Sequence, residues 1–246
     1  MLEKKLWKRW YNVLLSAYED LKYLLNRGYR KKYALEFVAN HYTLTSVERY
    51  FLTRCVFSDE EIAKRKRKIL KGEDLKGQVL GVDGFNVLIT LESVIEGKAI
   101  LCEDGLLRDL KHQGGYRINE NTQKVLELVM EALSDLELGE VWFLYDSPVS
   151  RSREVAKLTE KLMGNFGIKG EASLSKAPDH DLKNFEVVAS SDIGIIQKVP
   201  FIVDLPHMVT EWKGLKYLDF FEILKKPQLL KLSLIHISEP TRLGMI

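Results

Sequence analysis

The feature that most constrains this chain is a change in the spacing of its apolar residues near Gly77. Before Gly77, apolar residues recur at helical spacing. From residue 78 to about residue 205, short apolar runs alternate with amphipathic segments of helical spacing. Such alternation is typical of a parallel sheet, because each parallel connection needs a crossover. We therefore expect a small all-helical N-terminal domain followed by an α/β domain, a three-layer parallel sheet with helices on both faces.

The first part of the chain predicts helices at residues 7–25, 32–41 and 47–56, and a fourth from Ser58 to the basic run KRKRKIL. Ser58 with Glu61 matches the capping-box pattern at the start of a helix. Thr45 or Ser46 is expected to cap the third helix. These helices would make up a domain of residues 1–74.

The linker KGEDLKG leads into the α/β domain, for which we expect residues 75–231. Strands are predicted at residues 78–83, 98–103, 140–146, 186–192 and 201–205, and helices at residues 121–136, 150–166, 179–185 and 192–199. The strands 78–83, 140–146 and 186–192 each end in an aspartate.

The final residues do not belong to this pattern. LSLIHISEPTR, residues 232–242, matches the in-frame translation of a transposase sequencing adapter over eleven consecutive codons. We therefore treat residues 232–246 as an expected assembly artefact, separate from the folded chain. On this interpretation the native C-terminus is missing.

Charge divides the chain at the same place as the apolar pattern. Residues 1–76 hold 18 Lys and Arg against 10 Asp and Glu, and the remainder holds 19 against 25. This asymmetry indicates a module attracted to polyanions joined to one that gathers cations or acidic side chains; solvated helix faces are the alternative source of part of it. The sequence has no run of eighteen apolar residues and starts with the charged MLEKKLWKRW, so we expect a cytoplasmic protein without a membrane span. Cys55 and Cys102 have neither a neighbouring partner nor metal-site spacing, which predicts reduced thiols.

Aspartates gather at the predicted strand ends: Asp83, Asp146, Asp192 and Asp204, with Asp179 and Asp181 at the start of a short helix. In open parallel sheets ligands bind beyond the carboxyl ends of the strands, so these side chains are expected to converge. Clustered carboxylates repel each other, and a hard divalent cation neutralises them, which predicts magnesium or manganese. The alternative is that each aspartate only caps the helix that follows it. Asp204, followed by Leu205-Pro206, is the weakest member of the group.

Three segments resemble PIN-like and NYN-type nucleases: VLGVDGFNVL, VWFLYDS and PDHDLKNFEVVASSDIGII, in the same order and spacing. Over about residues 10–205 the chain also resembles a largely archaeal domain-of-unknown-function family, number four-three-four, with a helical first part and a PIN-like, Rossmannoid second part. The resemblance implies that the metal ligands are Asp83, Asp146, Asp181 and Asp192, with Asp179 as an alternate for Asp181. It also implies that Asn86 orients a carboxylate or a metal-bound water.

Several basic residues are candidates for contact with a nucleic acid. Ser150, Arg151 and Ser152 lie at the predicted start of a helix, where N–H groups and a guanidinium suit a phosphate; an ordinary N-cap is the alternative. Arg108, Lys111 and Arg117 in RDLKHQGGYR would track a nucleic-acid backbone, or belong to an exposed loop without function. Lys64, Arg65, Lys66, Arg67 and Lys68 would neutralise phosphates, with Tyr29, Tyr33, Tyr42 and Tyr50 stacking bases, or form a solvated face above core tyrosines.

Taken together, these features predict a metal-dependent ribonuclease with RNA as its partner. The predicted catalytic domain is itself net acidic, so either the helical part supplies the basic surface or catalysis has been lost. The alternative function is therefore a non-catalytic RNA-binding or scaffold protein that keeps the fold. A phosphatase that uses Asp146 as nucleophile is disfavoured, because Pro148 stands where a second Asp is needed. The Leu and Phe pattern of the first helices is also compatible with a homodimer interface.

Overall fold

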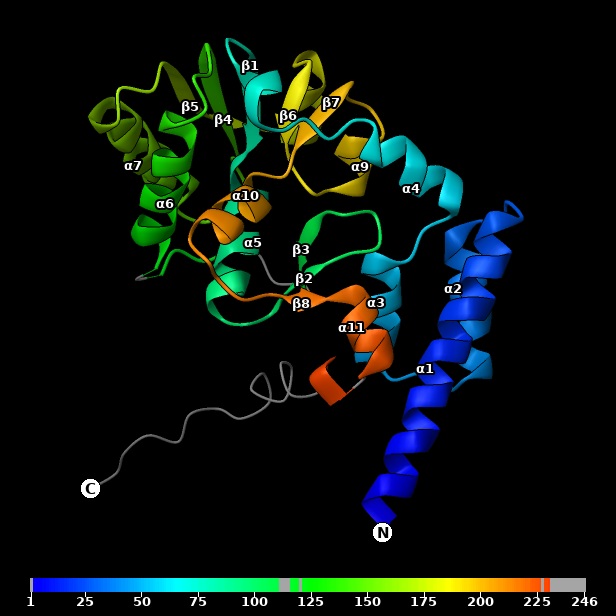
Figure 1. Ribbon diagram of the computed structural model, residues 1–246. Coiled ribbons are helices and arrows are strands. Elements are labelled where there is room, and N and C mark those ends of the chain that lie inside the picture. The colour runs from blue at the N-terminus through cyan, green and yellow to red at the C-terminus, as the bar shows by residue number, and fades with distance from the viewer. Residues whose placement is uncertain (1, 111–115, 120, 227, 231–246) are drawn as a thin grey trace, which may run out of the picture.

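The computed structural model describes residues 2–110, 116–119, 121–226 and 228–230. The N-terminal part consists of α1 (Leu2–Asn26), α2 (Lys31–His41), α3 (Ser46–Cys55) and α4 (Asp59–Lys66), as Figure 1 shows. A short 3₁₀ turn, η1 (Gly72–Leu75), leads into the α/β part. The order expected from the sequence, helices first and an α/β part second, is confirmed. The adapter-like residues 232–246 lie outside the described residues.

The starts of α3 and α4 follow the local signals in the sequence. Thr45 Oγ1 accepts a hydrogen bond from Glu48 N at 3.3 Å, and the Glu48 carboxylate accepts one from Thr45 N at 2.7 Å. Ser58 and Glu61 form the same reciprocal capping box at α4. Each box satisfies two backbone N–H groups that a helix start leaves without a partner.

The basic helix α4 is shorter than predicted, because the residues after Lys66 leave the helix and run along the edge of the sheet. Ile69 pairs in parallel with Ile202. Leu70 N donates to Ile202 O at 2.9 Å, and Ile202 N donates to Lys68 O at 2.8 Å. A backbone N–H that bonds to a strand is not available to a helix, so the strand edge ends α4.

The α/β part is built on a five-stranded sheet of order β5-β4-β1-β6-β7, in which all neighbours are parallel. Its strands are β1 (Val79–Asp83), β4 (Glu140–Asp146), β5 (Gly170–Ser175), β6 (Val187–Ala189) and β7 (Phe201–Val203). The chain runs outward from β1 through β4 to β5, and then crosses to β6 on the other side of β1. The strand order therefore reverses beside β1, and such a switch point leaves a crevice beyond the carboxyl ends of the strands.

Helices cover both faces of this sheet, as the sequence predicts. One face packs against α5 (Gly84–Ile95), α6 (Thr122–Ser134), α7 (Ser152–Asn165) and α10 (Leu205–Trp212); the other packs against η2 (Leu182–Asn184) and α9 (Ile193–Ile196). The short helix α8 (Pro178–Asp181) directly precedes η2. Phe143 belongs to the core on the first face and its neighbour Leu144 to the core on the second. This alternation is the ordinary period of a strand.

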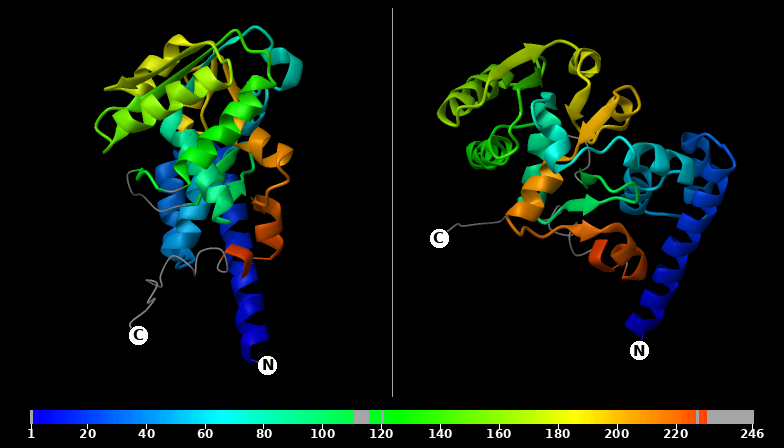
Figure 2. Two further views of the ribbon diagram at one scale, coloured as in Figure 1. Left: turned by 90° about the vertical axis from the view of Figure 1, so that its left-hand side faces the viewer. Right: turned by 45° about the horizontal axis from the view of Figure 1, so that its top comes forward.

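A second, smaller sheet joins the helical part to the α/β part. It has the order β3-β2-β8 and consists of β2 (Ala99–Leu101), β3 (Leu107–Asp109) and β8 (Leu218–Asp219), followed by α11 (Phe220–Lys225). Ile100 and Phe220 lie in one hydrophobic core with Leu21 of α1 and Phe51 of α3. Figure 2 shows this small sheet between α5 and the N-terminal helices. The sequence left residues 169–175, which contain β5, without an assigned element, and β3, β8, α10 and α11 were not predicted from it. None of the described helices is long and apolar enough to cross a membrane.

Candidate functional site

Asp83 ends β1 and caps α5 at the switch point of the sheet. Its Oδ1 accepts a hydrogen bond from Asn86 N at 3.3 Å, and its Oδ2 accepts one from Ser190 Oγ at 2.9 Å. Burial, with smaller contributions from the charges of Asp192 and Asp179, raises the pKa of Asp83 to about 7, although the two hydrogen bonds oppose this shift. A carboxylate held in this way would gain from a nearby cation, because the cation offsets the cost of its charge.

Asn86 ties α5 to the turn that follows β6. Its Oδ1 accepts hydrogen bonds from Ser191 N at 2.9 Å and from Ser191 Oγ at 3.1 Å. Asn86 therefore orients the Asp83 carboxylate with its backbone N–H, while its side-chain oxygen holds the neighbouring turn. The resemblance implied that Asn86 orients a carboxylate or a metal-bound water, and the contact with Asp83 agrees with the first of these roles.

Gly84, between Asp83 and α5, is required by packing. A Cβ at this position would lie 2.2 Å from Cε1 of Tyr145. Tyr145 is fully buried, and its hydroxyl lies 2.7 Å from Thr159 Oγ1 in a hydrogen bond. The bare backbone of Gly84 thus lets the strand tip of β1 approach the core ring of β4.

A pocket of about 570 Å³ opens beside Asp83. Asp83 of β1, Asp146 of β4 and Asp179 of α8 line it together. Lys176, His180 and Lys183 add basic groups, and Phe85, Ile89, Tyr116 and Val149 form apolar walls. Three of the aspartates that the sequence predicts to converge therefore share one pocket at the carboxyl edge of the sheet.

Asp181 and Asp192 lie at the margin of this group. Asp181 Oδ2 accepts a hydrogen bond from Ser175 Oγ at 2.5 Å, and this bond holds the pKa of Asp181 below its ordinary value. Asp192 Oδ1 accepts hydrogen bonds from two backbone N–H groups at the start of α9, so Asp192 is the cap of that helix. The structure thus places Asp179, the alternate in the sequence interpretation, in the pocket, and it places Asp181 against β5.

Asp204 behaves as an ordinary cap. It is buried, its Oδ1 accepts from His207 N at 3.0 Å, and its Oδ2 accepts from Leu107 N at 2.6 Å. These bonds tie the start of α10 to β3.

The chemistry of the pocket fits a hard cation, because its candidate ligands are carboxylate oxygens. The coordination geometry is not preformed: among the described residues, no three His, Cys, Asp or Glu side chains converge closely enough to hold a metal ion. Free carboxylates repel each other, and a bound cation offsets that repulsion because it attracts each of them. Binding would therefore have to draw Asp146 and Asp179 toward Asp83.

Two of the three predicted phosphate residues at the start of α7, Arg151 and Ser152, are engaged within the protein. Arg151 lies just before the helix with φ 61°, and its guanidinium donates to both carboxylate oxygens of Glu154 at 3.0 and 2.6 Å. Ser152 is buried, and its Oγ donates to Ser147 O at 3.3 Å. Ser150 is exposed. Ser150, Arg151 and Ser152 are not among the described residues that line the pocket.

The expectation for Arg108 is corrected by its position in β3. Arg108 is fully buried, and its guanidinium donates to the two carboxylate oxygens of Asp104 at 2.7 and 2.8 Å. Its Nε donates to Ser191 O at 3.1 Å, which connects Arg108 to the turn beside Asp83. Arg108 is therefore structural. Arg117 is exposed, and Lys111 lies outside the described residues.

The basic run 64–68 also divides into exposed and structural residues. Arg65 is buried, and its Nη1 donates a hydrogen bond to Asp104 Oδ2 at 2.9 Å. Its Cζ lies 3.8 Å from the centre of the Phe57 ring. Lys68 Nζ donates to two backbone carbonyls at the end of α9. Lys64, Lys66 and Arg67 are exposed. Arg65 and Lys68 are thus removed from the predicted nucleic-acid surface.

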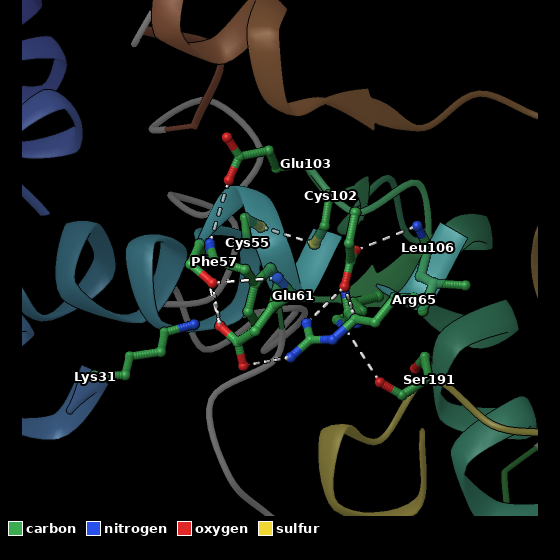
Figure 3. A network of polar contacts seen from close by, with 12 residues as sticks. Lys31, Cys55, Phe57, Glu61, Arg65, Cys102, Glu103, Leu106 and Ser191 are labelled. Carbon is green, nitrogen blue, oxygen red and sulfur yellow. Dashed lines mark hydrogen bonds and ion pairs between the residues drawn. The ribbon is translucent and has the colours of Figure 1, made fainter. Parts of the chain in front are cut away.

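Figure 3 shows the polar network between the helical part and the α/β part. Asp104 accepts hydrogen bonds from both Arg65 and Arg108, and it is itself fully buried. Next to it, Glu103 accepts from Lys22 Nζ at 2.7 Å and from Phe57 N at 3.2 Å. These acidic residues were not predicted from the sequence as part of a site. The available signal was the pair Glu103-Asp104 before Gly105, in a stretch that is otherwise apolar.

Lys176, Lys183 and Ser190 were missed as residues of the pocket region. The lysines flank PDHD, and Ser190 precedes the Ser-Asp at the end of a strand. Their position beside known candidates was therefore a usable signal, but their orientation depends on packing between β1, β5 and β6.

Comparisons with known proteins divide the chain in a similar way. A family model described as Protein of unknown function (DUF434) matches residues 13–68, and one described as Domain of unknown function (DUF5616) matches residues 72–208. The uncharacterized protein MJ0935 of the archaeon Methanocaldococcus jannaschii is 46% identical over 194 residues, which cover 77% of this chain and 93% of the relative. No solved structure matches the chain. The resemblance to family four-three-four is thus confirmed for the helical part, and the chain belongs to the DUF5616 family through its α/β part.

Proposed function

We propose that the α/β part is a PIN-like domain that hydrolyses phosphodiester bonds of RNA with magnesium or manganese. The observation that carries the proposal is that Asp83, Asp146 and Asp179 line one pocket at the switch point of a parallel sheet. The raised pKa of Asp83 shows that this arrangement is costly for the folded protein. Groups with such strongly shifted pKa values are concentrated at functional sites.

In this proposal Asp83, Asp146 and Asp179 hold the cation, and Asp192 adds negative charge beside Asp83. When bound, the metal would activate water and neutralise charge on the scissile phosphate. Ser190 and the backbone of Asn86 keep the Asp83 carboxylate at the strand tip. Asp181 serves as a positioning residue, because its bond to Ser175 anchors α8, which carries Asp179, to β5.

Lys176 and Lys183 supply positive charge at the pocket, although the α/β part as a whole is net acidic. Both line the pocket with the aspartates, so a basic surface exists locally although the domain as a whole carries negative charge. In the proposed enzyme they contact the phosphates that flank the scissile bond.

The helical part offers a second contact surface for RNA. Tyr29, Tyr33 and Phe37 are 59%, 60% and 67% exposed, and Tyr33 and Phe37 lie one helical turn apart on α2. Arg30 and Lys32 are exposed beside them. Exposed aromatic rings next to cations are suited to stack bases and contact phosphates. Tyr42 and Tyr50 are partly buried and are left out of this surface.

The test is cleavage of labelled single-stranded and structured RNA by the purified full chain with manganese or magnesium. We expect cleavage that a chelator abolishes and that the Asp83→Asn Asp146→Asn variant lacks. Glu171→Gln, which removes an exposed carboxylate from β5 of the same sheet, is the matched control and should cleave as the wild type does. Equal cleavage by wild type and the double Asp variant, or none by either, would reject the enzyme.

A non-catalytic RNA-binding protein is the second candidate, and it is favoured by the lack of a preformed three-ligand metal group among the described residues. It predicts salt-sensitive RNA binding that survives in the Asp83→Asn Asp146→Asn variant. Binding should fail when the exposed Lys64, Lys66 and Arg67 are replaced by glutamine. Binding that is unchanged by these replacements would eliminate this candidate.

A further inference from the structure

The interface between the helical part and the α/β part contains a pair of thiols that neither proposed function uses. Cys55 is the last residue of α3, and Cys102 directly follows β2. They are 47 positions apart in sequence, yet their Sγ atoms lie 2.9 Å from each other. Both residues are buried, with 0% and 4% of their surface exposed. Neither cysteine has a neighbouring partner in the sequence, and the fold brings the two together.

We propose that Cys55 and Cys102 form a disulfide that locks the helical part to the α/β part. The two sulfurs need to approach by less than 1 Å to reach the S–S bond length of about 2.05 Å. The bond would join residues 13–68 and 72–208, the segments matched by the two family models, across the core that they share.

The surroundings favour one of the two sulfurs as the nucleophile. Burial opposes ionisation of Cys102, but the hydrogen bond with Cys55 and the charge of Arg108 outweigh it and lower the pKa of Cys102. Burial raises the pKa of Cys55. Cys102 therefore provides the thiolate, which is the form that attacks a disulfide.

The reaction is thiol–disulfide exchange with a small-molecule disulfide as oxidant. The Cys102 thiolate attacks one sulfur of the reagent, which forms a mixed disulfide and releases one reagent thiolate. The Cys55 sulfur then loses its proton, attacks the Cys102 sulfur and displaces the second reagent thiolate. The protein pair loses two electrons and two protons, and the reagent is reduced to two thiols.

Burial determines when the exchange takes place and how long its product lasts. Because both sulfurs are enclosed, the reagent reaches them while the two parts dock or during opening of the interface. In the closed protein a reductant meets the same barrier. The bond is therefore a durable link rather than a rapid switch.

The test is a peptide map of wild-type protein refolded in a mixture of oxidised and reduced glutathione. Free thiols are alkylated at low pH, and the protein is digested with trypsin without reduction. We expect CVFSDEEIAK, residues 55–64, to be joined to AILCEDGLLR, residues 99–108. In Cys55→Ala, Cys102 should instead carry glutathione. Alkylation of both thiols in folded wild-type protein, or glutathione on each without a cross-link, would overturn the proposal.

A thermal measurement tests whether the link acts as a lock. The bond closes a loop of nearly fifty residues, so oxidised wild type should melt roughly 8 to 16 °C above the reduced protein. The Cys55→Ala Cys102→Ala variant should melt at the same temperature with and without reductant. A cross-linked wild type that melts with the reduced protein would refute the locking role. The peptide map needs no double variant, so it decides the first question even if that variant does not fold.

Discussion

Asp83→Asn separates the proposed chemistry of the pocket from the stability of the fold. Asparagine keeps the size of the side chain and the acceptor for Asn86 N, but it removes the charge. The pKa of Asp83 is about 7 in the folded protein, against an ordinary value of 3.8. The folded state binds this proton more tightly than the unfolded state does, so protonation of Asp83 stabilises the folded protein. This stabilisation is fully present below about pH 4 and is lost as the pH rises through about 7.

The magnitude follows from the shift. Each unit of pKa difference corresponds to about 1.4 kcal/mol, so ionisation of Asp83 removes up to about 4 kcal/mol from the wild type above pH 7. About 2.5 kcal/mol of this loss falls between pH 5 and pH 8. The variant does not ionise at this position. Its free energy of unfolding, relative to wild type, should therefore rise by about that amount over the same range.

The assay is urea denaturation at pH 5, 6, 7 and 8 in buffer without divalent ions, followed by tryptophan fluorescence. Glu171→Gln, which removes an exposed carboxylate from the same sheet, is the control. A stability difference for Asp83→Asn that does not change with pH would refute the assigned pKa. At pH 8, added manganese should raise the unfolding midpoint of wild type more than that of Asp83→Asn.

Two further changes test the packing that supports the pocket. Asp104→Asn leaves the buried guanidinium of Arg108 without a carboxylate and leaves Arg65 only its pair with Glu61, so urea denaturation should show a loss of about 3 to 5 kcal/mol; a loss below about 1 kcal/mol would contradict the buried network. Gly84→Ala puts a Cβ 2.2 Å from Tyr145 Cε1, and it should cost about 1 to 3 kcal/mol and reduce RNA cleavage. An unchanged unfolding midpoint would show that the Tyr145 ring can move aside.

Each of these changes has a matched control in the chain. Glu60→Gln, as a single substitution in a chain that keeps Asp104, breaks an exposed ion pair with Lys64. It should leave the urea unfolding midpoint unchanged. Gly164 of α7 has no atom within 4 Å of an added Cβ, so Gly164→Ala should raise stability by up to about 1 kcal/mol.

Local signals in the sequence predicted much of the fold. The capping boxes of α3 and α4 form as expected, because each depends on residues three positions apart. Strand β4 has the bounds that were predicted for it, since its apolar run is bounded by polar residues at both ends. The small sheet was not predicted, because β8 is only two residues long and is defined by its pairing with β2.

The candidate site was predicted in outline. Asp83 and Asp146 end parallel strands, and the geometry of such a sheet brings strand ends together whatever the intervening sequence. The choice between Asp179 and Asp181 was not available from spacing. It depends on the bond between Asp181 and Ser175, which follows from how α8 packs against β5.

By itself, the sequence determined the helical part, the alternating α/β part and the row of strand-end aspartates, because these features depend on interactions between residues close together in the chain. Only the tertiary structure decided which charged side chains are exposed to solvent. In sequence, Arg65 and Arg108 look no different from the exposed Lys66 and Arg67. In the fold, both guanidiniums are buried and donate hydrogen bonds to Asp104. The pairing of Cys55 with Cys102 has the same origin. The burial of these side chains depends on contacts between segments that are distant in sequence, so the residues around each of them do not predict it.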